Sequence, residues 1–444
     1  MVRAILFASL ILQFSLYSPG GEAQTAYAPN ELIIKIKASS AGYRQTQVMQ
    51  TFSAMGLSVV RPIASNLGAL SVYHVSEDTD IQHAISEIKR LPYVEYVTPN
   101  YLFGLTPPNK QAQSGLSNLE KSIKPPLMSR PPEVIPSQPD PDSKLSYGLK
   151  SMNVPQAWTT AGESSSMIVA VIDTGVDYNH EDLAFNMWRT PSPIGDVVGF
   201  DPYANDGLPY DDDKVYGHGT HAAGIIGAVY GNGRGTVGVN RKVSIMAIKG
   251  LTGNGFAWTE HLVAGLIYAV DHGAKIISAS WANAKKDNPP IIDALNYAAA
   301  KGVLVVVAAG NSAGDNDNDA TAEYPAGYIM DHLMAVASVD ENDQLAKSSN
   351  YGAKTVALAA PGVNIYSTLP ENKYGFESGT SMACPAAAGA AALVWSTYPS
   401  LTNIQVKKAL MDSVDRVPSL AGKTVTGGRV NVARALELAK LMAK

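Results

Sequence analysis

The sequence has a single cysteine, Cys384, among its 444 residues. One thiol cannot form an intramolecular disulfide, and it cannot supply the several thiolates of a metal cluster. Charged residues are also scarce, at 16%, and 34 basic residues are outnumbered by 39 acidic ones. The resulting net charge of −5 argues against nucleic-acid binding as the main function. Hydrophobic residues make up 46%, which predicts a packed core rather than extensive disorder.

The sequence also lacks a hydrophobic run long enough to span a membrane. An apolar stretch near the N-terminus, residues 4–12, follows Arg3 and precedes the small residues Gly21 and Ala23. This stretch is shorter than the ~20 residues of a membrane anchor, which is the alternative interpretation. A basic start, a short apolar segment and a small-residue cleavage site are typical of a secretory signal peptide. We therefore predict a signal peptide over residues 1–23 and a secreted protein, extracellular or periplasmic.

The next region, up to residue 104, has the pattern of a small α+β unit. Apolar residues alternate over residues 31–37, as in a strand, and recur at helical spacing over residues 81–91. A further strand is expected at residues 94–97 and should stop at Pro99.

A proline-rich segment separates this unit from a longer region with a different pattern. Prolines recur through residues 105–143 without a hydrophobic period, which predicts an extended, protease-sensitive linker. Over residues 144–444, continuous apolar runs alternate with helical patterns, as expected of strands buried on both faces of a parallel sheet. We predict an α/β fold in which a mostly parallel open sheet carries helices on both faces. The strands are expected at residues 168–172, 243–248, 275–280, 303–308, 333–339 and 356–359, and helices include residues 258–272 and 290–301.

Two residues with acid–base chemistry follow or open these elements. Asp173 ends a predicted strand, and such sheets carry functional groups at the carboxyl ends of their strands. The alternative is an aspartate that caps a turn. His218 lies among glycines in Gly-His-Gly-Thr-His and could act as a general base. His218 and His221 could instead form a metal pair, but zinc pairs usually include a helical glutamate, so we expect His221 to be structural.

Two further residues could supply a nucleophile and an oxyanion donor. Ser381 lies in a Gly-Thr-Ser turn that opens a helix of small residues, and Pro385 fits the first turn of that helix. The positive end of the helix dipole favours negative charge that develops at such a serine. Asn311 follows a predicted strand, and its amide could donate to an oxyanion. The alternatives are a simple N-cap serine and a turn asparagine.

In chain order, Asp173, His218 and Ser381 provide a carboxylate, a base and a nucleophile. The sequence resembles the subtilisin-like serine proteases, or subtilases, in four motifs. These motifs are Asp-Thr-Gly at Asp173, His-Gly-Thr-His at His218, Ala-Ala-Gly-Asn at Asn311 and Gly-Thr-Ser-Met-Ala at Ser381. The resemblance implies a secreted, monomeric serine endopeptidase that cleaves protein or peptide substrates through an acyl-enzyme, with Asn311 in the oxyanion hole.

The resemblance continues into the N-terminal half. Residues 28–104 are similar to the subtilisin propeptide, an intramolecular chaperone and inhibitor, and residues 91–101 look like its end. The enzyme would then be made as a zymogen that processes itself. The expected domains are a signal peptide over residues 1–23, a propeptide over 24–104, a linker with the processing region over 105–143 and a peptidase domain over 144–444.

The resemblance also implies a substrate cleft. Two edge segments would clasp an extended peptide as added β-strands, and a third would line the pocket for the side chain before the scissile bond. The matching residues are Gly253, Asn254, Gly255, Ser280, Trp281 and Ala282 in the edges and Ala308, Ala309 and Gly310 in the pocket. Trp281 and Ala282 replace the usual Leu-Gly pair, and a side chain at Ala282 is expected to narrow the cleft.

Acidic loops point to calcium, which prefers several oxygen ligands from flexible loops. Asp182 and Asn232 match calcium-binding positions of some subtilases, so we expect a structural calcium ion there and no catalytic cofactor. Solvated polar loops are the alternative. Bound calcium would stabilise an exported chain that has no disulfide.

Three alternatives stay open at this stage: another nucleophile and two other functions. Cys384 could be the nucleophile, but we expect it inside the helix as a small buried side chain. A catalytically silent calcium-binding adhesion or scaffold protein would share the fold, although all four catalytic positions are intact. An esterase or amidase has less support, because no Gly-x-Ser-x-Gly motif surrounds Ser381.

Overall fold

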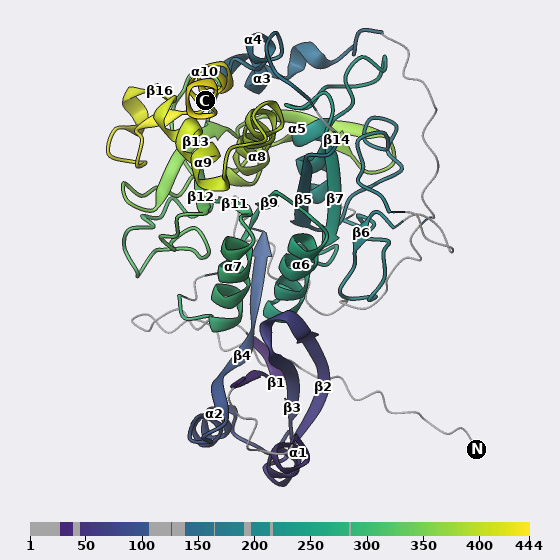
Figure 1. Cartoon of the computed structure of the whole chain (residues 1–444), viewed down its shortest axis with the longest axis vertical. Coiled ribbons are helices and arrows are strands. Elements are labelled where there is room, and N and C mark those ends of the chain that lie inside the picture. The colour runs from purple at the N-terminus through teal and green to yellow at the C-terminus, as the bar shows by residue number, and fades with distance from the viewer. Residues whose placement is uncertain are drawn as a thin grey trace, which may run out of the picture.

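The computed structural model describes residues 27–38, 45–105, 126, 138–163, 165–190, 197–213, 216–283 and 286–444. The predicted signal peptide and most of the predicted linker lie outside these residues. The described chain forms a small N-terminal unit (residues 27–105) and a larger main unit (residues 138–444), which meet along two helices of the main unit (Figure 1). No helix in the described ranges is long and apolar enough to cross a membrane.

The N-terminal unit is an antiparallel sheet covered by two helices on one face. Its strands lie in the order β4, β1, β3, β2. Alternation along β1 gives the sheet two apolar faces: Leu32 and Ile34 pack in the unit's own core, whereas Ile33 packs with the main unit. The elements are β1 (Tyr27–Ile36), α1 (Gln45–Ala54), β2 (Leu57–Ala64), β3 (Ala69–Val75), α2 (Ile81–Lys89) and β4 (Val94–Leu105).

Strand β4 is longer than its sequence predicts. We expected the strand to stop at Pro99, but it continues to Leu105. Its first half pairs with β1, and its last residues, Leu102–Leu105, pair with the short main-unit strands β8 (Phe256–Trp258) and β10 (Trp281–Ala282). Proline lacks only its own N–H, so strands on either side of β4 can still pair with the neighbouring residues. The strand therefore joins the two units.

The main unit is built on a nine-stranded sheet in the order β16-β17-β13-β12-β11-β9-β5-β7-β6. The six predicted strands are all present in it, and they are parallel as expected. They are β5 (Ile168–Asp173), β7 (Ser244–Lys249), β9 (Ile276–Ala279), β11 (Leu304–Ala308), β12 (Leu333–Val339) and β13 (Val356–Pro361). The edge strands are β6 (Gly199–Phe200) and β16 (Asp415–Arg416), and β17 (Gly428–Arg429) lies between β16 and β13.

Helices cover both faces of this sheet (Figure 1). Because both faces are buried, consecutive residues of β5 enter different cores: Val169 and Val171 pack in one, Ala170 and Ile172 in the other. The helices toward the N-terminal unit are α6 (Thr259–Asp271) and α7 (Pro289–Ala300). The other face carries α5 (His218–Gly227), α8 (Thr380–Thr397), α9 (Asn403–Asp412) and α10 (Val432–Met442), with the short helices α3 (Tyr147–Ser151) and α4 (Val154–Ala157) nearby. A hairpin of β14 (Ile365–Leu369) and β15 (Lys373–Glu377) leads into α8.

Candidate active site

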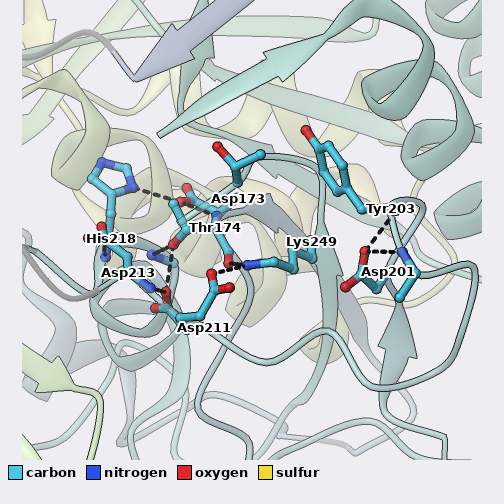
Figure 2. Close-up of polar contacts among 12 residues, drawn as sticks. Asp173, Thr174, Asp201, Tyr203, Asp211, Asp213, His218 and Lys249 are labelled. Atoms are coloured by element: carbon cyan, nitrogen blue, oxygen red, sulfur yellow. Dashed lines mark hydrogen bonds and ion pairs between the residues drawn. The ribbon is translucent and has the colours of Figure 1, made fainter. Parts of the chain in front are cut away.

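Asp173 and His218 are in direct contact. Asp173 is the last residue of β5, and His218 is the first residue of α5. His218 Nδ1 lies 2.8 Å from Asp173 Oδ1, which also accepts the Thr174 backbone N–H at 2.8 Å (Figure 2). Burial alone would lower the pKa of His218, but the charge and hydrogen bond of Asp173, with smaller contributions from Glu377 and Asp213, raise it to about 9. The contact with Asp173 therefore stabilises the protonated imidazolium form of His218.

The glycines of the His-Gly-Thr-His motif allow this contact. Gly217 precedes α5 with a left-handed φ of 61°. A Cβ at Gly219 would lie 2.0 Å from the Gly175 carbonyl oxygen and 3.1 Å from Cβ of Asp173. Any larger residue at this position would force the start of α5 away from the end of β5.

A buried carboxylate fixes the loop between these elements. Asp211 accepts hydrogen bonds from Thr174 Oγ1 at 2.9 Å and from both the backbone N–H and the hydroxyl of Thr220, at 2.9 and 2.6 Å (Figure 2). Burial raises the pKa of Asp211 to about 6. Lys249, at the end of β7, donates to the Thr174 carbonyl at 2.7 Å and pairs with Asp212 at 2.5 Å. These bonds hold Thr174, and with it Asp173, at the end of β5.

Ser381 is the second residue of α8, so the N-cap interpretation is wrong: Gly379 is the N-cap residue. Pro385 lies in the second turn of the helix, not in the first as expected. Because proline has no N–H, it cannot donate to the carbonyl four residues earlier, which belongs to Ser381. The Ser280 hydroxyl donates to this carbonyl instead, at 3.0 Å. Ser280 thus replaces a missing helix bond directly behind Ser381.

Asn311 follows β11 and is held against the residue before Ser381. Its Oδ1 accepts from the Thr380 backbone N–H at 2.9 Å and from the Thr380 hydroxyl at 3.1 Å. The Gly310 N–H in turn bonds to Thr380 Oγ1 at 3.2 Å. With Oδ1 on Thr380, the Nδ2 end of the amide is turned the other way and can serve as a donor.

The two histidines of the motif do not form a metal pair. His221 Nε2 lies 2.9 Å from the Ile365 carbonyl and 3.3 Å from that of Gly375, and burial lowers the pKa of His221 to about 3. A neutral, hydrogen-bonded His221 agrees with its predicted structural role. Within the described ranges, no group of three or more His, Cys, Asp and Glu side chains could hold a metal ion.

Cys384 is not placed to act as the nucleophile. It lies inside α8 with 0% of its surface exposed, and its thiol bonds to the Val306 carbonyl at 3.3 Å. Burial raises the pKa of Cys384 to about 11, so the thiolate needed for attack is strongly disfavoured.

The end of β4 lies between the two predicted edge segments. The Leu105 N–H donates to the Gly255 carbonyl at 2.9 Å. On the other side, Leu105 pairs with Trp281 and Gly104 pairs with Ala282. The Trp281 ring is buried edge-on against Phe103, with centroids 5.6 Å apart. Ala282 thus faces a glycine in the neighbouring strand, and the absence of a side chain there leaves room for the Cβ of Ala282.

Both remaining parts of the predicted cleft lie next to these contacts. Gly253 and the exposed Asn254 form the turn before Gly255, and a Cβ at Gly253 would lie 2.5 Å from Asp212 Oδ1. Ala308 and Ala309 are buried where β11 ends, directly before Gly310 and Asn311.

Two clusters of polar contacts hold the N-terminal unit on α6 and α7. The buried Glu260 forms an ion pair with Arg61 and accepts from Asn100 at 3.0 Å. Asp293 accepts from Lys35 at 2.7 Å and from Tyr96 at 2.9 Å. A charged residue that is buried by docking is costly unless it is paired, so these contacts make the interface specific.

The two residues matched to calcium lie in one buried polar cluster. Asp182, with 0% exposed surface, accepts from Asn232 Nδ2 at 2.8 Å and from the Thr236 N–H at 3.1 Å. The nearby Asp140 accepts three N–H groups, from residues 231–233. Burial, reinforced by the charge of Asp140, raises the pKa of Asp182 to about 7.

Sequence reasoning missed three residues beside the candidate site. Thr380 orients Asn311, and Glu377 at the end of β15 interacts electrostatically with His218. Burial, opposed by His218, raises the pKa of Glu377 to about 7. The third residue, Glu323, lies against Gly310. Glu377 could have been noticed from its position four residues before Ser381, but nothing in the local sequence marks Glu323.

Comparisons with known proteins agree on the family. The subtilase family model matches residues 164–431, and that of the fervidolysin N-terminal prodomain matches residues 19–100. A thermophilic serine proteinase from Bacillus sp. (strain AK1) is 32% identical over 407 residues, which cover 91% of this chain and 87% of that protein. Thermitase from Thermoactinomyces vulgaris is 40% identical over 296 residues, which cover 66% of this chain and 97% of thermitase.

A solved structure supports the same relationship. The crystal structure of fervidolysin from Fervidobacterium pennivorans, described as a keratinolytic enzyme related to subtilisin, matches with a TM-score of 0.69 and 27% identity. The match covers 93% of this chain and 61% of that one. The fold prediction is therefore confirmed, and the chain belongs to the subtilase family of serine endopeptidases and carries an N-terminal prodomain of the fervidolysin type.

Proposed function

We propose that this subtilase cleaves peptide bonds with Asp173, His218 and Ser381 as its catalytic triad. The observation that carries the proposal is the position of the Leu105 end of β4. This end pairs with Trp281, and the neighbouring Ser280 bonds to the Ser381 carbonyl. A peptide strand bound in this place would run toward the start of α8, where Ser381 lies.

In the proposed reaction, Ser381 Oγ attacks the peptide carbonyl while His218 Nε2 takes the serine proton and then donates it to the leaving amine. Asp173 holds Nδ1 of His218, which fixes the tautomer and stabilises the imidazolium. Asn311 Nδ2 and the Ser381 backbone N–H bind the oxyanion. Removal of such an asparagine donor typically costs about 2.7–4 kcal/mol of transition-state stabilisation. Water then hydrolyses the acyl-enzyme.

We further propose that the protein is a secreted, monomeric zymogen that releases its own prodomain. Support for inhibition comes from β4, because a strand that fills the space between β8 and β10 competes with a substrate for the same backbone groups. Cleavage is expected in or near residues 105–143. Secretion is supported by the N-terminal sequence pattern of residues 1–23.

Labelling of the mature enzyme with a fluorophosphonate tests the proposed function. A serine activated by His218 should react, and the modified tryptic peptide should contain Ser381. Prior incubation with a peptide substrate should slow the labelling. An unlabelled protein, or a label on another serine, would favour the silent scaffold alternative. Parallel assays on casein and on a simple ester would separate an endopeptidase from an esterase.

We propose a structural calcium site at Asp182 and Asn232, with Asp140 as a further ligand. Carboxylate and amide oxygens are the preferred ligands of calcium. The Asn232 amide, whose Nδ2 donates to Asp182, would have to rotate so that its oxygen takes the place of Nδ2. Asp182 is fully buried, and no basic side chain within the described residues pairs with it. A bound calcium ion would supply the missing positive charge and so stabilise the fold; it would take no part in the reaction.

The proposed site predicts a stabilisation by calcium that depends on pH. Because the pKa of Asp182 is raised from 3.8 to about 7, its ionisation in the native state is unfavourable. Without calcium, the contribution of Asp182 to stability is fully present below about pH 4 and is lost as the pH rises through 7. Calcium should therefore raise the melting temperature more at pH 8 than at pH 5. The gain at pH 8 is about 3 kcal/mol when free calcium exceeds Kd about 100-fold.

The measurement uses the full chain with Ser381→Ala, which avoids self-digestion, in EDTA and in calcium. Asp182→Asn should abolish the difference between the two melting curves. Asp412→Asn is the matched control, because Asp412 is exposed on α9 and pairs with Lys408, far in sequence from the proposed site. Equal calcium effects in all three proteins would refute the site.

A further inference from the structure

A carboxylate lies beside the segment that precedes Asn311. Glu323 is in the loop between β11 and β12, and a Cβ placed on Gly310 would lie 2.7 Å from Glu323 Oε2. The next residue, Tyr324, exchanges two backbone hydrogen bonds with Asn283, at 2.8 and 3.0 Å. Glu323 is thus anchored between two predicted substrate-binding segments, Ala308–Gly310 and Ser280–Ala282.

Glu323 therefore lies beside the segment that is predicted to line the pocket for the residue before the scissile bond. Asn283 donates to the Leu102 carbonyl at 2.6 Å, and the preceding Ala282 pairs with Gly104. The segment Ser280–Ala282 is therefore the one that holds β4. The other segment, Ala308–Gly310, contacts the residue before Ser381, because the Gly310 N–H bonds to the hydroxyl of Thr380. The residue just before the scissile bond would therefore place its side chain between these two segments.

The carboxylate of Glu323 is fixed by neutral groups alone. Ser312 Oγ donates to Oε1 at 2.5 Å, and the Asn350 side chain also donates to the carboxylate. Neither an ion pair nor an attraction to a cation accompanies these bonds within the described residues. Burial raises the pKa of Glu323, but the residue keeps part of its surface exposed. A positioned carboxylate of this kind can accept a charge-assisted hydrogen bond from a positively charged group.

We infer that Glu323 determines the specificity of the enzyme, and that it selects lysine or arginine at the residue before the scissile bond. This inference rests on the proposed function. An ammonium or guanidinium group that reaches the carboxylate would gain a charge-assisted hydrogen bond in a partly desolvated place. An acidic side chain would meet like charge there, and an apolar one would leave Glu323 without a counterion.

The test compares three peptide p-nitroanilides that differ only in the last residue, which is lysine, methionine or glutamate. For the mature wild-type enzyme, kcat/KM with lysine should exceed that with methionine at least about 10-fold, and glutamate should be poorest. In Glu323→Gln, the lysine-to-methionine ratio should fall to about one. Glutamine keeps an acceptor oxygen for Ser312, so the fold should be retained. In the wild type the ratio should also rise with pH, as Glu323 loses its proton.

Asp319→Asn is the matched control, because it removes one negative charge from the same loop at an exposed residue paired with Lys286. Its lysine-to-methionine ratio should stay at the wild-type value. An equal fall in both variants, or none in Glu323→Gln, would overturn the inference.

A second measurement needs no variant. Benzamidine, which carries a cationic amidine, should compete with the methionine substrate, whereas neutral benzamide should not. A wild-type enzyme that cleaves the methionine peptide as well as the lysine peptide and ignores benzamidine would refute the role of Glu323 while the proposed function stands. A wild-type enzyme that cleaves none of the peptides would refute the proposed function itself.

Discussion

Replacement of Ser381 by alanine is expected to lower kcat by about 10⁶-fold and to leave the prodomain attached to the chain. The reason is that the proposed reaction forms the acyl-enzyme on Ser381 Oγ, an atom that alanine lacks. The neighbouring thiol of Cys384 is buried and has a pKa raised to about 11. The contact between Ser280 and Ser381 uses the backbone carbonyl of Ser381, so the variant should fold normally.

Gel electrophoresis of the purified full chain, followed by N-terminal sequencing, measures this prediction. The wild type should shorten at a site in or near residues 105–143, and the Ser381→Ala chain should keep its full length. Ser378→Ala is the matched control: Ser378 lies just before α8, and its hydroxyl accepts the Asn364 N–H at 2.8 Å. Release of the prodomain by pure Ser381→Ala protein, without another protease, would refute the assignment of the nucleophile.

The buried sheet was predictable because its pattern is local. Each of the strands around Asp173 is a continuous apolar run, and a run of this kind has to be covered on both faces wherever it lies in the chain. The carboxyl ends of parallel strands meet at one edge, so the approach of Asp173 to the start of α5 also followed from the order of elements. Contacts that depend only on sequence order and periodicity could therefore be predicted.

The contacts that the sequence did not reveal join segments far apart in the chain. Pro99 is a valid local signal for the end of a strand, yet β4 continues because β8 and β10, more than 150 residues later, supply its partners. The role of Ser280 depends on a proline 105 residues away, which leaves the Ser381 carbonyl without its helix donor. Glu323 lies in a loop without a recognisable motif, and its position against Gly310 is seen only in the folded structure.

The surroundings of His218 bear on the pH at which the enzyme works. Besides Asp173, the carboxylates of Glu377 and Asp213 raise the pKa of His218, and His221 stays neutral beside it. In the proposed reaction His218 must be unprotonated to accept the serine proton, so activity should increase with pH until His218 has lost its proton. The excess of negative charge around the imidazole thus favours alkaline conditions.

Asp173→Asn should lower kcat by about 10⁴-fold, because an amide cannot stabilise the imidazolium and allows the wrong tautomer of His218. It should also move the acidic limb of the kcat/KM profile to lower pH. Asp173 is the strongest group that raises the pKa of His218 to about 9, so its loss lets burial lower that pKa. A purely structural role for Asp173 would reduce activity equally at every pH and leave the limb in place.

For this measurement, wild-type enzyme removes the prodomain from each variant, and kcat and KM are determined from pH 5 to pH 10. Asp177→Asn is the matched control. Asp177 is also buried, but its carboxylate accepts the backbone N–H groups of Asn179 and Glu371 and none from His218. Its loss should lower the melting temperature without moving the acidic limb. A shift of the limb in Asp177→Asn but not in Asp173→Asn would show that the direct 2.8 Å contact does not set the pKa of the base.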